Sequence, residues 1–290
     1  MKYPIELELT NYCLLKCEFC PNKDFKNRSF IDEKYFYKII DYIYFNRNKI
    51  LFLDLSWIWD VFLHPKIWDF LLYISKKFKN TNFEILIPTK WNSINYKHIN
   101  VLKQIHNEWL NFNLSIGFYS MLPEKHDIIS WKENFFQIID FIKKIKNEQI
   151  PFSLELLIDK YSINELKYFY KFWDKLWVNY KVHNYHNFWW SIKNKELEKF
   201  NSKDFKLKCS FADDEKYKLD NFYCEYTLPF IWSDGFLYLC SHWWKQLKYK
   251  SENILDLFIK YPNYLDLLEY IKNRLTKNIC RNCTYLKYNK

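Results

Sequence analysis

Short apolar runs alternate with amphipathic segments along the first 185 residues of the chain. The apolar runs predict strands, and the helical periodicity between them predicts helices. The predicted strands are 5–10, 50–55, 83–88, 110–116, 152–158 and 178–182, and the predicted helices are 32–46, 65–78, 93–106, 132–148 and 162–173, the last with a capping box of Ser162 and Glu165. This succession predicts an α/β fold, in which a parallel sheet with outer helices curls into a partial (βα)6 barrel of the TIM type.

The alternation stops near residue 190, where a segment rich in Lys and Glu begins. Five of the eight cysteines follow residue 205, and the sequence SDG at 233–235 predicts a hairpin turn. We therefore expect a core domain over 1–190, a connector over 191–205 and a small Cys-rich α+β domain over 206–290.

The net charge of +10 raises the question of a nucleic-acid partner. Only four of the 44 basic residues are Arg, the residue that specific readers of nucleic acid favour for bidentate contacts. The chain is also rich in Lys, Asn, Ile, Phe and Tyr, which have A/T-rich codons. We therefore attribute the charge to genome composition and do not expect nucleic acid as a partner.

The chain begins MKYPIELELT, which lacks the apolar segment and the cleavage site of a signal peptide. No apolar run approaches the roughly 20 residues that a membrane helix needs. We expect a soluble, cytoplasmic protein that does not associate with membranes. In that compartment, cysteines are expected to bind metal or take part in catalysis rather than form disulfides.

Cys13, Cys17 and Cys20 are spaced C-x3-C-x2-C in the loop after the first predicted strand. Three thiolates at this spacing can hold three irons of a [4Fe–4S] cube and leave the fourth iron open to a small molecule. Zinc is the alternative, but zinc sites commonly combine C-x2-C pairs with a fourth ligand, and none is evident nearby.

The segment LTNYCLLKCEFCPN resembles the CxxxCxxC motif of radical SAM enzymes, and Phe19 matches the aromatic residue usually found before the last cysteine. The resemblance covers about residues 3 to 185. It implies that the open iron binds S-adenosylmethionine, which is cleaved reductively to a 5′-deoxyadenosyl radical that abstracts hydrogen from the substrate. It also implies an electron donor such as flavodoxin or ferredoxin.

Four later cysteines, Cys224, Cys240, Cys280 and Cys283, resemble the ligands of the SPASM/twitch extension of radical SAM enzymes. Their spacing suits the shorter twitch form, which implies one auxiliary [4Fe–4S] cluster. A structural zinc held by the same four thiolates is the alternative. Cys209 is left over and is interpreted as a bystander, with a role as a ligand or beside the substrate as the alternative.

Radical SAM enzymes carry a glycine-rich GGEP-type segment after the second strand, and its backbone lines the methionine end of S-adenosylmethionine. Residues 56–65 fall in register with it, but Trp57 and Trp59 stand where glycine is expected and Asp60 replaces the glutamate. His64 matches a histidine of the segment that we interpret as structural. The resemblance assigns these residues to cofactor binding: Phe19, Ser56, Trp57, Trp59, Asp60, Thr89 and Ser115.

The chain has 2 Gly and 13 Trp, where ordinary usage predicts about 20 Gly. Several tryptophans lie at predicted turns or loops, namely Trp91, Trp131, Trp177, Trp189, Trp190, Trp243 and Trp244. We hypothesise that UGA codons of this gene are read as glycine in the cell, with one or two genuine tryptophans among the thirteen. The alternative is a protein whose core is rich in tryptophan.

The leading interpretation is a radical SAM oxidoreductase that modifies a small molecule or a peptide. Two alternatives remain open. An RNA-modifying radical SAM enzyme is suggested only by the charge, and a non-catalytic iron–sulfur electron-transfer protein is favoured if Trp57 and Trp59 are genuine. Release of 5′-deoxyadenosine separates an enzyme from a binding protein.

Overall fold

The structure is a computed structural model that describes residues 2–17, 20, 28–55, 59–94, 96–108, 110–158, 163–184, 229–238 and 252–275. Its strands form one eight-stranded sheet in the order β6-β5-β4-β3-β2-β1-β7-β8. The first six strands are β1 Tyr3–Leu7, β2 Ile50–Asp54, β3 Glu84–Thr89, β4 Phe112–Phe118, β5 Phe152–Ile158 and β6 Asn179–Asn184. Each of these strands pairs in parallel with the next, which confirms the predicted α/β class and the parallel sheet of a partial barrel.

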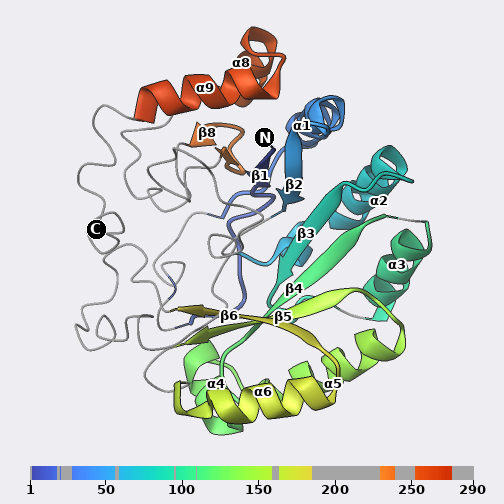
Figure 1. Cartoon of the computed structure of the whole chain (residues 1–290), viewed down its shortest axis with the longest axis vertical. Coiled ribbons are helices and arrows are strands. Elements are labelled where there is room, and N and C mark those ends of the chain that lie inside the picture. The colour runs from blue at the N-terminus through green and yellow to red at the C-terminus, as the bar shows by residue number, and fades with distance from the viewer. Residues whose placement is uncertain are drawn as a thin grey trace.

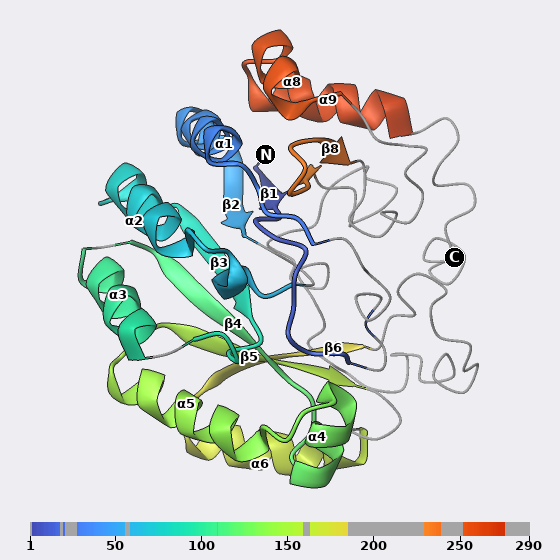
Figure 2. The same cartoon turned by 180° about the vertical axis from the view of Figure 1, so that it is seen from behind.

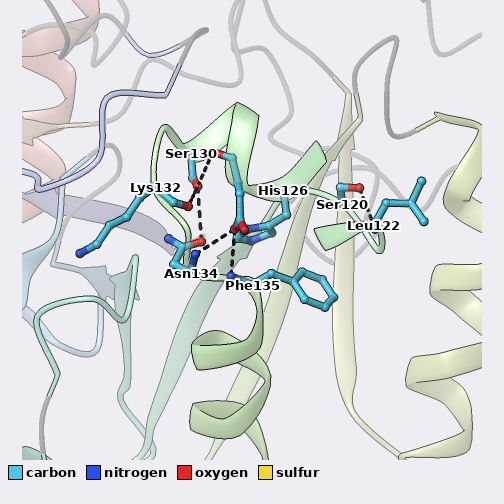
Figure 3. A network of polar contacts seen from close by, with 8 residues as sticks. Ser120, Leu122, His126, Ser130, Lys132, Asn134 and Phe135 are labelled. Carbon is cyan, nitrogen blue, oxygen red and sulfur yellow. Dashed lines mark hydrogen bonds and ion pairs between the residues drawn. The ribbon is translucent and has the colours of Figure 1, made fainter. Parts of the chain in front are cut away.

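Helices cover the outer side of this curved sheet (Figure 1). They are α1 Glu33–Asn46, α2 Ile67–Phe78, α3 Tyr96–Asn107, α4 Pro123–Ser130, α5 Phe135–Asn147 and α6 Leu166–Lys175, with short 3-10 turns η2 Val61–Leu63 and η3 Ile163–Glu165. Helix α4 was not predicted from the sequence, because its eight residues carry only a weak apolar periodicity. A hydrogen-bond network joins the end of α4 to the start of α5 (Figure 3).

The capping box predicted at Ser162 and Glu165 stays a prediction. Ser162 lies outside the described residues, and α6 begins at Leu166. The Glu165 carboxylate accepts hydrogen bonds from Ser120 Oγ at 2.6 Å and from the Met121 amide at 2.7 Å. Glu165 therefore holds the loop between β4 and α4.

The two faces of the sheet have different chemistry. Ile5 and Leu7 of β1, and Leu9 just after it, alternate along the chain and belong to the large apolar core that the outer helices share. The residues between them, Glu6 and Glu8, are buried on the opposite face. The same inner face carries buried polar side chains from other strands, namely Asp54, Ser115 and Ser153. The inner face therefore differs from the aliphatic layers that fill a closed TIM barrel.

Residues of the C-terminal segment extend the same sheet. Strand β7 (Phe230–Ile231) pairs in parallel with β1, and β8 (Leu237–Tyr238) returns antiparallel to β7. This confirms the hairpin predicted at SDG, where Gly235 has a φ of 79°. The predicted domain limits at 190 and 205 lie outside the described residues and stay a prediction.

Helices α8 (Ile254–Lys260) and α9 (Tyr264–Leu275) lie beside α1 and β8 (Figure 2). The Tyr264 hydroxyl donates to the Pro4 carbonyl at 2.6 Å, and the Asn46 amide group donates to the Pro262 carbonyl at 3.1 Å. These contacts join the last described helix to the first strand and the first helix. Within the described residues, no helix has the length and apolar character to cross a membrane.

Candidate functional site

The three N-terminal cysteines lie together in the loop after β1. Cys17 is buried, and Cys13 and Cys20 are half-buried against the same small apolar cluster, which contains Leu15 and Tyr119. A tight turn links two of the cysteines, because the Cys20 amide donates to the Cys17 carbonyl at 2.9 Å. The three thiols therefore lie together, as the sequence predicted.

Short polar contacts tie the two ends of this cysteine loop together. Thr10 Oγ1 donates to the Ser29 carbonyl at 3.0 Å, and the Ser29 amide donates to Asn11 Oδ1 at 2.6 Å. The backbone amide of Asn11 donates to the Ser29 carbonyl at 3.2 Å. The loop is thus closed at its base by residues that precede and follow the cysteines.

Tyr119 approaches the cysteines from the loop after β4. The Cys17 thiol donates to the Tyr119 hydroxyl across 3.4 Å. The Lys90 ammonium lies 6.0 Å from the centre of the Tyr119 ring. Gly117 leaves room for that lysine, because a Cβ at 117 would lie 2.8 Å from Lys90 Nζ. Neither Tyr119 nor Lys90 was predicted from the sequence. Both follow the carboxyl ends of predicted strands, where the active sites of barrel enzymes lie.

The environment of the thiols favours their protonated form in the absence of metal. Burial raises the pKa of Cys13, and the nearby negative groups Asp60 and Cys17 raise it further. Burial also raises the pKa of Cys17, while the Tyr119 hydrogen bond and the Lys90 charge act in the opposite direction. Thiolates are the form that binds metal, so an iron cluster would release these protons as it binds.

Asp60 lies in the loop after β2, where it is buried and contacts the cysteine loop and the end of β3. Its Oδ1 accepts from Thr89 Oγ1 at 3.0 Å, and its Oδ2 accepts from Ser93 Oγ at 2.7 Å. Its own amide donates to the Tyr12 carbonyl at 3.2 Å. Burial raises the pKa of Asp60, and the hydrogen bonds from Ser93 and Thr89 partly offset that effect. The structure therefore brings together Asp60 and Thr89 and adds Ser93, which the sequence analysis missed.

The other predicted cofactor residues are placed as follows. Trp59 is almost fully buried and interacts with the Glu8 carboxyl group. Ser115 is buried on the inner face, and within the described residues its Oγ has no hydrogen-bond partner. Several predicted site residues lie outside the described residues: Phe19, Ser56, Trp57, Cys224, Cys240, Cys280 and Cys283, together with Cys209.

His64 has the structural role that we expected. It is buried, its Nε2 lies 3.2 Å from the Ile31 carbonyl oxygen, and its Nδ1 accepts from the Lys66 amide at 3.1 Å. Both ring nitrogens therefore have backbone partners.

Glu8 is a second buried carboxylate at the carboxyl end of β1. Its Oε1 accepts from Ser233 Oγ at 2.9 Å, and Ser233 lies in the β7–β8 turn. Burial raises the pKa of Glu8 to about 8, and Asp234 adds a smaller effect in the same direction. This residue joins the inner face of the sheet to the C-terminal segment, and no motif in the sequence indicates it.

The donor set fits an iron–sulfur cube better than a single metal ion. In the part of the chain that the structure describes, no group of three His, Cys, Asp or Glu side chains is arranged to hold one ion. A cube instead binds each cysteine at a different iron, so its ligands need not converge on one point. Three neighbouring thiols against one apolar cluster, with Tyr119 beside one sulfur, meet that requirement.

The sequence profile of the radical SAM superfamily matches residues 7–172, and the chain belongs to this superfamily. The match begins within β1 and ends within α6, so it includes the cysteine loop and the Asp60 contacts. Members of this superfamily bind a [4Fe–4S] cluster and S-adenosylmethionine. No curated protein sequence matches the chain.

Solved structures with the same fold include SuiB of Streptococcus suis bound to S-adenosylmethionine, with a TM-score of 0.69 and 16% identity over 99% of this chain and 72% of SuiB. SuiB bound to precursor peptide SuiA has a TM-score of 0.67 and 14% identity over 91% of this chain and 66% of SuiB. Native anSMEcpe with bound AdoMet and Kp18Cys peptide has a TM-score of 0.65 and 14% identity over 97% of this chain and 87% of that protein. At these identities the likeness establishes the fold.

Proposed function

We propose that the chain is an enzyme that uses S-adenosylmethionine to abstract hydrogen from a peptide or small-molecule substrate. The observation that carries the proposal is the group of Cys13, Cys17 and Cys20 in one buried cluster after the first strand of a radical SAM fold. These three thiolates would hold the [4Fe–4S] cluster. When bound, the cluster and S-adenosylmethionine supply a 5′-deoxyadenosyl radical that removes a hydrogen atom from the substrate.

The chain's own residues would bind and orient these groups. Tyr119 and Lys90 place a hydroxyl and a positive charge near Cys17, where they favour its ionised form. Asp60, held by Thr89 and Ser93, fixes the loop that would line the methionine end of S-adenosylmethionine. Glycine at positions 57 and 59 of the cellular protein is part of the proposal, because glycine lets backbone approach a ligand closely. At position 59 this part rests on the register of the motif, since Trp59 is buried and is not among the described residues with a positive φ.

A peptide substrate is supported by two observations. SuiB and anSMEcpe, which share the fold, have been solved with bound peptides. The inner face of the present sheet carries buried acidic and hydroxyl side chains, including Glu6, Glu8 and Ser115. Such groups can form hydrogen bonds with the backbone and polar side chains of a peptide, whereas a purely apolar surface could not.

A second part of the proposal concerns the C-terminal segment. Cys224, Cys240, Cys280 and Cys283 would hold an auxiliary [4Fe–4S] cluster in a SPASM/twitch-type domain, with structural zinc as the alternative occupant. A small cytoplasmic electron carrier such as flavodoxin or ferredoxin would supply the electrons. The spacing of the four cysteines supports this part, together with the β7–β8 hairpin that lies between Cys224 and Cys240.

Anaerobic reconstitution followed by reduction in the presence of S-adenosylmethionine tests the catalytic proposal. We expect the protein to release 5′-deoxyadenosine, and we expect Cys13→Ala, Cys17→Ala and Cys20→Ala each to abolish that release. Cys209→Ala is the matched control and should retain it. Release of 5′-deoxyadenosine by any of the three ligand variants would refute the assignment.

A further inference from the structure

Five non-glycine residues in the described part of the chain have a positive φ, and three of them are tryptophan. The five are Asn80, Trp91, Trp131, Gln149 and Trp177, with φ between 53° and 59°. A positive φ is uncommon for any residue with a Cβ and is a genuine outlier for a bulky one, whereas Asn is several-fold enriched there. The three tryptophans are therefore the residues that this conformation fits least well.

Trp131 ends helix α4 in the left-handed conformation that glycine usually adopts at this position. Its amide donates to the Ile128 carbonyl, and the next amide, of Lys132, reaches back to the Asp127 carbonyl at 3.1 Å. Figure 3 shows Ser130 bonded to Lys132 and Asn134 around this turn. The backbone at 131 is thus fixed from both sides, while the Trp131 side chain is 69% exposed.

Trp177 ends α6 in the same way. Its amide donates to the Asp174 carbonyl, and the Val178 amide donates to the Trp173 carbonyl at 3.2 Å, which completes the two-bond pattern of a glycine-terminated helix. The Trp177 side chain is 93% exposed. An indole gains little from such exposure, so neither backbone nor side chain explains a tryptophan here.

Trp91 occupies the turn between β3 and α3. Its amide donates to Thr89 Oγ1 at 2.8 Å, and its carbonyl accepts from the Ile94 amide at 2.9 Å. These bonds hold a φ of 57° directly beside the Asp60 contacts. Gly235, which is glycine in the sequence, occupies a turn with a φ of 79°.

Trp68 and Trp173, which the structure describes, have no such conflict. Trp173 lies within α6, is 1% exposed, and packs edge-to-face on Phe118 with ring centres 5.5 Å apart. Trp68 lies within α2 and stacks on His98 with ring centres 4.2 Å apart. Glycine at either position would weaken a helix interior and remove an aromatic contact.

An alternative explanation is that the exposed indoles of Trp131 and Trp177 form a docking surface. That explanation accounts for the exposure of the two side chains but not for the left-handed conformation of their backbone. A docking residue has no need of a left-handed conformation, yet both residues have one and both end helices through the hydrogen bonds typical of glycine.

We infer that the cellular protein has glycine at positions 91, 131 and 177 and tryptophan at positions 68 and 173. UGA is then decoded as glycine at the first three positions, and UGG as tryptophan at the other two. This division of the tryptophans does not depend on the catalytic proposal above.

Peptide mass spectrometry of the protein isolated from its own cells, together with the codons of the gene, tests the inference directly. We expect peptides with glycine at 91, 131 and 177, each encoded by UGA, and peptides with tryptophan at 68 and 173. Tryptophan in the native protein at any of the first three positions, or glycine at either of the other two, would overturn the division.

Variants of the recombinant full chain test the conformational argument. We expect Trp131→Gly and Trp177→Gly to be more stable than Trp131→Ala and Trp177→Ala, by about fivefold in the unfolding equilibrium constant, because alanine keeps a Cβ at positive φ. Phe172, exposed within α6, is the control position. There Phe172→Ala should be more stable than Phe172→Gly, because glycine weakens a helix interior. If alanine equals or exceeds glycine at 131 and 177 in urea unfolding, the inference fails.

Discussion

Thr89 donates a 3.0 Å hydrogen bond to the buried carboxylate of Asp60, although the two residues are 29 positions apart in the chain. Thr89 ends β3, and Asp60 follows β2, the neighbouring strand in the sheet. Parallel pairing brings the carboxyl ends of both strands to one edge, where the contact forms beside the cysteine loop. The same hydroxyl accepts a hydrogen bond from the amide of residue 91, so one side chain supports two turns of the site.

Replacing Thr89 tests the importance of this contact. Thr89→Val keeps the shape but removes both hydrogen bonds, so we expect a loss of about 1–3 kcal/mol in the free energy of unfolding. Thr89→Ser keeps the hydroxyl and should lose less. Urea unfolding measures both variants, and an unchanged midpoint for Thr89→Val would show that Asp60 is held by Ser93 and the backbone alone.

Removing the Tyr119 hydroxyl should change the redox properties of the proposed cluster. Hydrogen bonds to cluster sulfurs help to set the reduction potential. Tyr119→Phe deletes the partner of the Cys17 sulfur, so we expect a more negative potential with unchanged iron content. A redox titration followed by electron paramagnetic resonance measures this shift. Tyr37→Phe, on α1, is the control, and equal potentials in the two variants would contradict the prediction.

Glu8 should make the stability of the fold depend on pH. Its pKa rises from 4.5 to about 8 on folding because the carboxyl group is buried. Between these values the folded chain keeps a proton that the unfolded chain has lost, so the free energy of unfolding falls as pH rises. The slope can reach about 1.4 kcal/mol per pH unit for one group.

Glu8→Gln should flatten this slope, because the amide oxygen can still accept from Ser233 without ionising. The comparison is made by urea unfolding at pH 5, 6, 7 and 8, values spanning about three units of the expected window. Glu269→Gln, exposed on α9, is the matched control and should keep the parent slope. The same steep slope in Glu8→Gln would show that another group titrates.

The second set of cysteines predicts a specific iron stoichiometry. Two cubes at four irons each give about eight irons per chain after anaerobic reconstitution. Replacing Cys280 and Cys283 together by Ala should halve the iron and leave the first cluster able to support S-adenosylmethionine cleavage. Iron and zinc analysis of the parent protein decides the occupant, and four irons with one zinc would favour the structural zinc instead.

Much of the core fold could be predicted from the sequence, because each buried strand is a short apolar run between polar turns. The motif spacing of Cys13, Cys17 and Cys20 also predicted their grouping, since the three residues are close in sequence. Tyr119 lies 102 positions from Cys17, and nothing local in the sequence indicates that contact. Distant contacts of this kind depend on strand order, which an apolar pattern does not specify.

Two further features show the same limit. Helix α4 was missed because its sequence, PEKHDIIS, is short and mostly polar. Glu165 was expected in a helix cap because of its spacing from Ser162, and its contacts with Ser120 and Met121 were not predicted. Tertiary partners of this kind become visible only in the folded chain.

The pairing of β1 with β7 has a consequence for the order in which the protein can be completed during synthesis. Glu6 leaves the ribosome long before its β7 partner, Phe230, is made, because the other strands of the core lie between them in the sequence. Until then, the nascent protein presents one open edge of its first strand, next to the Glu8 carboxyl group. Open strand edges pair readily with other chains. Translation that stops before residue 230 should therefore yield an aggregation-prone fragment rather than a smaller working enzyme.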